Sequence, residues 1–138
     1  YLALDGNVTW VEFRNTSEEG AFAANQGDRI PNRPYLFGTG SARVQLSEVA
    51  DANDELSLTW TSRYVHEFYR GWEGLGTSKL TVPAQLVHAV ALTYVARGKP
   101  TELSFTGEAQ NVTNAAAFDV FGVPRPGRAV FFKATASL

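Results

Sequence analysis

Apolar and polar residues alternate with a period of two along most of this chain. Over 2–10 the even positions carry Leu2, Leu4, Val8 and Trp10, and mostly polar residues stand between them. Such alternation is typical of a β-strand with one apolar and one polar face, because successive side chains point to opposite sides. The same pattern recurs in five further segments, at 36–47, 56–68, 86–95, 103–110 and 130–138.

The segments differ in which positions are apolar. In 86–95 the residues Val87 and Val95 make the second face nearly as apolar as the first, so the register of this segment is the least well defined. In 103–110 the apolar residues move to odd positions, beginning with Leu103, and in the last segment they return to even positions. Each segment still predicts a strand with a distinct apolar face.

The connections between these segments alternate strictly between long and short. Three long ones cover 15–34, 70–84 and 114–127, and two short ones cover 48–54 and 97–101. An antiparallel meander places successive connections at opposite ends, so one end is expected to carry long loops and the other tight turns. Transmembrane β-barrels of the outer-membrane type have this asymmetry. The pattern predicts an all-β chain, an antiparallel meander of about six long strands.

Composition narrows the classes of function. A formal net charge of −2 leaves no basic field for nucleic acid, so nucleic acid is not an expected partner. The absence of cysteine excludes disulfides, thiolate metal sites and a cysteine nucleophile. No apolar run approaches the roughly 18 residues of a membrane-spanning helix, whereas a spanning strand needs only about 9–11. Because the first residue is Tyr1, we expect a mature product or a fragment.

Several short motifs follow one another in a defined order. The sequence "NVTN" at 111–114 precedes "RPGR" at 125–128, and an alternating segment then runs to the last residue. Upstream stand "GDRIPNRPYLF" at 27–37 and "PAQLVHAVALTY" at 83–94. In order and spacing these motifs resemble the C-terminal end of TonB-dependent outer-membrane receptors. The resemblance covers essentially the whole chain, and its last 37 residues are the most specific part.

This resemblance implies a fold and a function. Residues 1–138 would form the last six strands of a 22-stranded transmembrane barrel whose plug domain lies outside this sequence. The whole receptor would carry out TonB-dependent uptake of a scarce ligand, namely a metal chelate, a corrin or an oligosaccharide. The implied location is the bacterial outer membrane. The implied partners are outer-membrane lipid, the barrel-assembly machinery, TonB (through the N-terminal part) and a small-molecule or chelate ligand.

Physical reasoning favours a piece of a larger assembly. A closed barrel of six strands would be narrower than one of eight strands, whose interior side chains already fill. An open sheet in lipid would leave the backbone groups of its edge strands unpaired, at several kcal/mol each. We therefore expect this chain to be a fragment that does not close alone.

The alternation also assigns candidate residues to surfaces. We expect the polar face to line a lumen and the apolar face to meet lipid, with aromatic residues at its interfaces. The loops are expected to contact ligand. The resemblance further assigns the C-terminal assembly signal to Phe132 and to Leu138, which stands where the family usually has an aromatic residue. The lumen-facing polar residues are Arg43, Arg63, Glu67, Glu108 and Lys133; the interface aromatics are Trp10, Trp60, Tyr64 and Tyr94; the loop candidates are Arg70, Trp72 and Arg125.

No catalytic, metal or cofactor site is predicted. His66 and His88 fall on different strands without carboxylates at ligand spacing, so we expect rings near a membrane interface. The chain has no G-x-S-x-G motif. The N-x-[ST] sequons at Asn7, Asn15 and Asn111 are interpreted as coincidence and turn chemistry.

Two other readings stay open. The chain could be a soluble β-sandwich or lipocalin-like ligand-binding module, which requires a second layer over the apolar face. It could also belong to a small outer-membrane adhesin or enzyme barrel of about eight strands.

Overall fold

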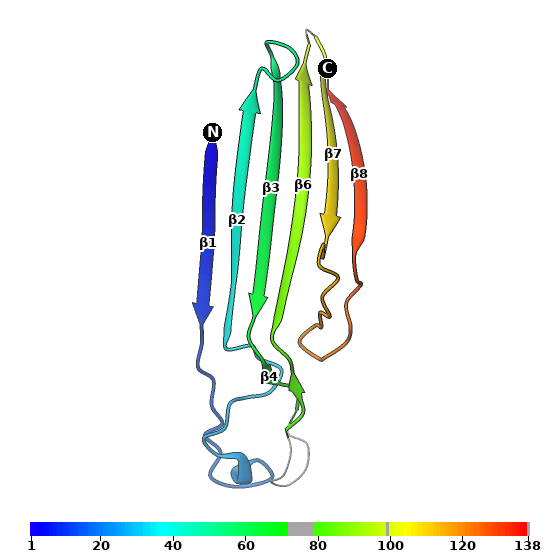
Figure 1. The fold of residues 1–138 in the computed structure, drawn as a ribbon. Helices are drawn as coiled ribbons and strands as arrows, with labels where there is room; N and C mark the ends of the chain where they lie inside the picture. Colours follow the sequence, from blue (N-terminus) through cyan, green and yellow to red (C-terminus); the bar gives the residue numbers. More distant parts are fainter. Residues whose placement is uncertain (72–78, 99, 138) are drawn as a thin grey trace.

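The protein is described by a computed structural model that covers residues 1–71, 79–98 and 100–137. It is all-β, and its six long strands form one antiparallel sheet in the order β1-β2-β3-β6-β7-β8 (Figure 1). This confirms the predicted meander of about six long strands. The strands are β1 (Leu2–Trp10), β2 (Leu36–Ser47), β3 (Asp54–Val65), β6 (Gln85–Arg97), β7 (Glu102–Gln110) and β8 (Ala129–Ser137).

Short elements complete the described part of the chain. The two-residue strands β4 (Phe68–Tyr69) and β5 (Thr81–Val82) pair with each other between β3 and β6. One turn of 3-10 helix, η1 (Ala23–Asn25), lies in the first loop. Within the described ranges, no helix is long and apolar enough to cross a membrane.

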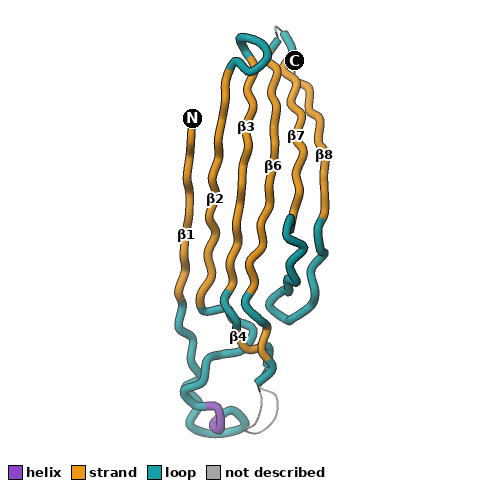
Figure 2. Tube along the Cα trace, viewed as in Figure 1, coloured by secondary structure: helices purple, strands orange, loops and turns teal. Residues whose placement is uncertain are grey.

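The loops are sorted by length between the two ends of the sheet, as the sequence predicts. The described residues of the long connections β1–β2, β3–β6 and β7–β8 all lie at one end, and those of the two tight turns lie at the other (Figure 2). At the tight end, Asp54 closes the β2–β3 turn. Its carboxylate accepts backbone N–H groups of Val49, Ala50 and Asp51, and the Tyr94 hydroxyl donates to it at 2.8 Å.

The strand register brings the apolar positions of all six strands onto one face. Directly opposed residues share a face, and one continuous row crosses the sheet. The shift to odd positions in β7 also has a cause: the turn between Arg97 and Glu102 has four residues, so even positions of β6 oppose odd positions of β7. The row consists of Leu2, Val44, Leu58, Leu92, Gly107 and Phe132.

The apolar face of the sheet is uncovered. Val8 is 79 % exposed, Trp10 70 % and Phe132 86 %. Within the described residues, the buried apolar side chains are Phe68, Val82 and Ala117, and all three lie outside the six long strands. The described structure is therefore a single-layered sheet without a second layer over its apolar side.

The third strand is shorter than the alternation indicates. It ends at Val65, and the backbone N–H of His66 donates to the carbonyl of Leu36 at 2.9 Å. The alternation over 56–68 places Phe68, an even position, on the exposed apolar face, but Phe68 instead pairs with Val82 in the β4–β5 ladder and is 5 % exposed. The expectation was wrong because alternation continues through Phe68, whereas the tertiary contact that turns the chain leaves no periodic signal.

Candidate functional site

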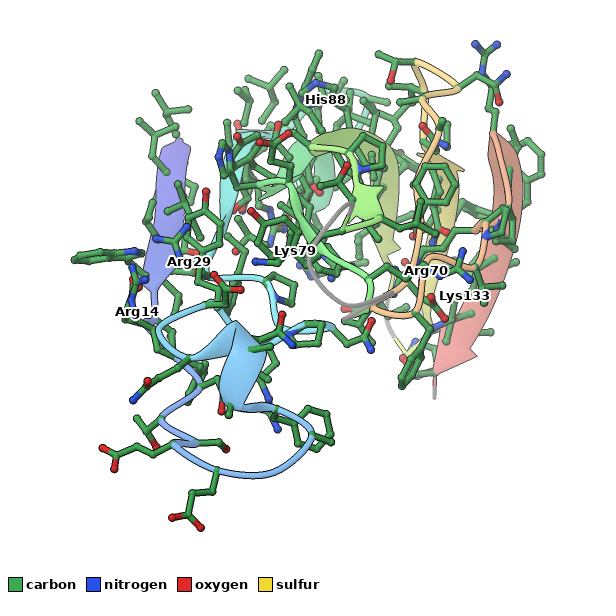
Figure 3. All side chains as sticks on the ribbon, turned by 90° about the horizontal axis from the view of Figure 1, so that it is seen from below. Arg14, Arg29, Arg70, Lys79, His88 and Lys133 are labelled. Atoms are coloured by element: carbon green, nitrogen blue, oxygen red, sulfur yellow. The ribbon has the colours of Figure 1, made fainter. Side chains whose placement is uncertain are left out.

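A cavity of about 360 Å³ opens on the polar face of the sheet, near the end with the long loops. Its floor includes Thr61 of β3, Ala89 of β6 and Ala129 of β8, and its roof includes Phe118 and Pro126 of the β7–β8 loop. A view along the strands places His88 of the apolar face and Lys133 of the polar face on opposite sides of the sheet (Figure 3). The cavity thus lies on the side away from the exposed apolar surface.

Small side chains in one row of the sheet account for the space. Thr61, Ala89, Gln110 and Ala129 are directly opposed across four strands. Two of these four positions carry only a methyl group, so the loop above them does not fill the volume down to the sheet. The polar face at this level is therefore hollow.

Side-chain hydrogen bonds hold the β7–β8 loop over the floor. The Gln85 side-chain oxygen accepts the backbone N–H of Phe118 at 2.7 Å, and the carbonyl of Ala117 accepts the N–H of Arg125 at 2.8 Å. The amide of Asn111 bonds both the N–H and the carbonyl of Ala115 at 2.9 Å. Gln85 and Asn111 are 7 % and 5 % exposed, so these bonds are shielded from water.

The two motifs at the ends of this loop contact each other. The Asn114 Oδ1 of "NVTN" accepts the backbone N–H of Arg128 of "RPGR" at 3.0 Å. A Cβ at Gly127 would lie 2.6 Å from the same oxygen, so a larger residue here would have to displace the Asn114 amide. Asn111 and Asn114 adopt positive φ angles of 48° and 53°, which asparagine tolerates better than most residues. The motifs therefore define the loop that roofs the cavity.

The charges around the cavity are separated along the strand direction. Arg63 lies one row from Val65 and Gln85 at the loop end, and Arg125 is tied to the same end through Ala117. Glu108 also lines the cavity, but it lies two rows deeper. Four residues of strand separate these levels, about 13 Å. The cavity is therefore cationic at the end near the long loops, which we call its outer end. It is anionic at the opposite, inner end, where Glu108 lies.

The register locates the residues expected to face a lumen. Arg43, Arg63, Glu108 and Lys133 all lie on the polar face of long strands. Glu67 does not, because the chain leaves the sheet after Val65; it instead lines a small hollow of about 90 Å³ with Arg29 and Arg33. The placement of Glu67 on a strand was therefore wrong, for the same reason as that of Phe68.

Of the loop residues expected to contact ligand, the structure describes Arg70 and Arg125, and they lie in different surroundings. Arg125 lines the cavity. Arg70 does not line it, and its side chain packs beside Gly122, where an added Cβ would meet the Arg70 Cδ at 3.2 Å. Trp72 lies outside the described residues. Sequence reasoning missed Gln85 and Phe118, whose hydrogen bond forms the roof, and the only signal available was the pair of alanines on a polar face.

The apolar face carries the remaining candidates. Trp10 is the last residue of β1 and Tyr64 is one residue from the end of β3, whereas Trp60 stands in the middle of β3. Tyr94 lies near the tight turns, bonded to Asp54. Phe132 is exposed on the apolar face of β8, and Leu138 lies outside the described residues.

Both histidines contact aromatic and hydroxyl groups rather than carboxylates. His88 Nδ1 lies 2.8 Å from the Ser62 hydroxyl and 3.3 Å from Trp60 Nε1, and His66 Nδ1 lies 2.7 Å from the Tyr64 hydroxyl. No group of three or more metal-ligating side chains occurs in the described ranges.

The first loop is held by a cluster of charges. Glu12 pairs with Arg14 at 2.5 Å and with Arg29 at 3.2 Å, and the Arg29 guanidinium lies 3.6 Å from the ring centroid of Tyr35. The hydrogen bond from Arg29 lowers the pKa of Glu12, and burial opposes this effect. Asn15 is buried and bonds the carbonyl of Phe22, so its amide serves the turn.

Comparisons with protein-family models, with curated protein sequences and with solved structures found no match.

Proposed function

We propose that this chain forms part of the wall of a TonB-dependent outer-membrane receptor, as the last six strands of a 22-stranded barrel. The observation that carries the proposal is the apolar face, which continues across six hydrogen-bonded strands without any described segment over it. In an outer membrane, the acyl chains of lipids would cover this face. Further strands of the receptor would pair with β1 and β8, which are the two edges of the described sheet.

The dimensions of the apolar face support the same proposal. Tyr94 opposes Leu56 near the tight turns, and Tyr64 opposes Leu86 near the long loops. Eight residues of β3 separate these two rows, about 27 Å along the strand. A strand tilted by about 40° would span about 20 Å of membrane depth, close to the apolar band of roughly 25 Å in outer-membrane barrels. Aromatic residues lie at both limits of this span, as interfacial girdles require.

In this arrangement the polar face lines the barrel interior and the long loops lie outside the cell. The loops and the cavity beneath them would contact a scarce ligand such as a metal chelate, a corrin or an oligosaccharide. TonB would act on the plug domain rather than on these strands, and the barrel wall itself would catalyse no reaction. Phe132 and Leu138 would contribute to the signal read by the barrel-assembly machinery.

A soluble β-sandwich or lipocalin-like module is the alternative. It would need a second layer over the apolar face, and the described residues supply none. The single-layered sheet therefore favours the membrane reading over this one.

Cysteine labelling tests the orientation, because the chain has no cysteine of its own. Val90 and Ala91 are neighbours on opposite faces of β6. In the complete gene product reconstituted into vesicles, a bimane fluorophore on Val90→Cys should be quenched strongly by lipids with brominated acyl chains. The same fluorophore on Ala91→Cys should be quenched weakly. Equal weak quenching at both positions would refute a membrane-spanning sheet.

The receptor class is tested separately by the coding sequence upstream of Tyr1. We expect it to encode a plug domain and roughly sixteen further alternating strands. A gene without them would contradict the receptor assignment even if the sheet spans a membrane.

A further inference from the structure

We infer that the cavity under the β7–β8 loop binds a small amphiphilic anion, a carboxylate on an aromatic or other apolar body. Its volume of about 360 Å³ lies at the lower end of the range for small-molecule sites, about 300–1,000 Å³. The inference deepens the proposed function by naming a ligand class for the wall. The preference for an anion rests on the cavity residues alone.

Two arginines supply the polar end. Arg63 and Arg125 both line the cavity, and within the described residues neither forms an ion pair with a carboxylate. The other polar-face arginine of β2 and β3, Arg43, pairs with Glu55. A guanidinium has donors in a fixed fork that matches a carboxylate in a bidentate arrangement. These two arginines, at the end of the cavity near the long loops, are therefore suited to an anionic group.

The rest of the cavity suits an apolar body. Val87 and Ala89 form part of the floor, and the rings of Phe118 and Phe131 line the roof side and the inner end. Aromatic rings offer a large apolar surface with defined packing geometry. Such a lining would bind a flat hydrocarbon body better than a freely hydrated ion such as phosphate.

Glu108 determines the orientation in which a ligand is expected to bind. It lies at the inner end and accepts a hydrogen bond from the Gln110 side chain at 2.8 Å, so it presents a carboxylate to any ligand that enters deeply. A ligand carboxylate would be repelled there and attracted to Arg63 and Arg125 at the end near the long loops. The ligand should therefore bind with its apolar body inward and its anionic group toward the loops.

A set of three probes with one body tests this inference. 4-(Trifluoromethyl)benzoate, 4-(trifluoromethyl)benzamide and 4-(trifluoromethyl)benzylamine carry a negative, a neutral and a positive group, and fluorine NMR reports their binding to the complete gene product in detergent. We expect saturable binding of the benzoate at least about tenfold tighter than that of the other two probes, because charge-assisted hydrogen bonds are about twice as strong as neutral ones. Equal affinities, or no saturable binding of the benzoate, would overturn the inference.

Matched variants locate the site. Arg63→Gln and Arg125→Gln should each weaken benzoate binding about tenfold or more. Arg128→Gln should leave it within twofold, because Arg128 is three residues from Arg125 but does not line the cavity. Ala129→Leu, which fills the floor, should abolish binding of every probe that binds the wild type. An equal loss in Arg128→Gln, or full binding in Arg125→Gln, would contradict the assignment.

The proposed membrane wall and the proposed anion site can be refuted independently of each other. Quenching by brominated lipids decides whether the sheet faces a membrane, and the three-probe comparison decides whether the cavity prefers an anion. A result against one leaves the other measurement unchanged.

Discussion

The side-chain oxygen of Asn114 accepts the backbone N–H of Arg128 at 3.0 Å, and this bond joins the two ends of the β7–β8 loop. Fourteen residues separate the partners in sequence, yet they stand where β7 has ended and β8 is about to begin. The bond joins the two ends of the loop and adds to the hydrogen bonds of Gln85 and Asn111 that hold the loop over the polar face.

Replacement of Asn114 should loosen this loop. Asn114→Ala removes the acceptor and places alanine at a φ of 53°, so we expect a loss of about 1–3 kcal/mol in the free energy of unfolding. Asn114→Gly tolerates the backbone angle and should lose only about 0.5–1.5 kcal/mol. Urea unfolding followed by tryptophan fluorescence measures both, with exposed Thr113→Ala as the control. Equal losses in Asn114→Ala and Thr113→Ala would show that the bond does not stabilise the loop.

A side chain at Gly127 should destabilise the β7–β8 loop. A Cβ would lie 2.6 Å from Asn114 Oδ1, so Gly127→Ala must displace the amide or the loop backbone. We expect faster proteolysis within 111–128 and a loss of about 1–3 kcal/mol, typical of overpacking. Gly40→Ala, whose Cβ would meet its nearest neighbour at 4.0 Å, should be close to neutral. Wild-type protease resistance in Gly127→Ala would refute the close contact.

An arginine on the apolar face should be costly in lipid. Val90 lies near the middle of this face, so Val90→Arg should lower the free energy of unfolding in vesicles by about 2–4 kcal/mol. Ala91→Arg, one position along on the polar face, should cost much less. Reversible unfolding of the complete gene product in vesicles measures the difference. A smaller loss in Val90→Arg than in Ala91→Arg would reverse the proposed orientation.

The first loop should lose stability in acid. The hydrogen bond from Arg29 lowers the folded-state pKa of Glu12 below its usual value of about 4.3. A lowered carboxylate pKa contributes stability that is fully present above the unfolded pKa and is lost as the pH falls through the folded pKa. Cleavage within 11–35 by pepsin should therefore rise below about pH 4, and Glu12→Gln should cleave readily across this range. Exposed Glu18→Gln serves as the control and should keep the wild-type profile.

Alternation was sufficient to predict the strands, because a half-buried or half-lipid-exposed strand must repeat its polarity every second residue. It predicted the six strands and the sorting of their connections between the two ends. It placed Arg43, Arg63, Glu108 and Lys133 on one face. It was misleading at Glu67 and Phe68, where polarity still alternated but the backbone had turned out of the sheet into the β4–β5 ladder.

The sequence patterns could not predict the cavity. It depends on Phe118 and Pro126, which belong to a loop without periodicity, and on Gln85, which looked like one more polar residue of a strand. The hydrogen bond from the Phe118 N–H to the Gln85 side chain, which is a tertiary contact, shows that the loop folds over the sheet. No residue type in that loop encodes this path by itself.

The sequence by itself determined the element type, the faces and the order of long and short connections, since each follows from local spacing along the chain. Tertiary structure decided where β3 ends, how the loop motifs meet, and that two arginines and a row with two alanines line one cavity. The physical reason is that these features arise from contacts between strands and loops distant in sequence, and such contacts leave no regular trace in the order of residues.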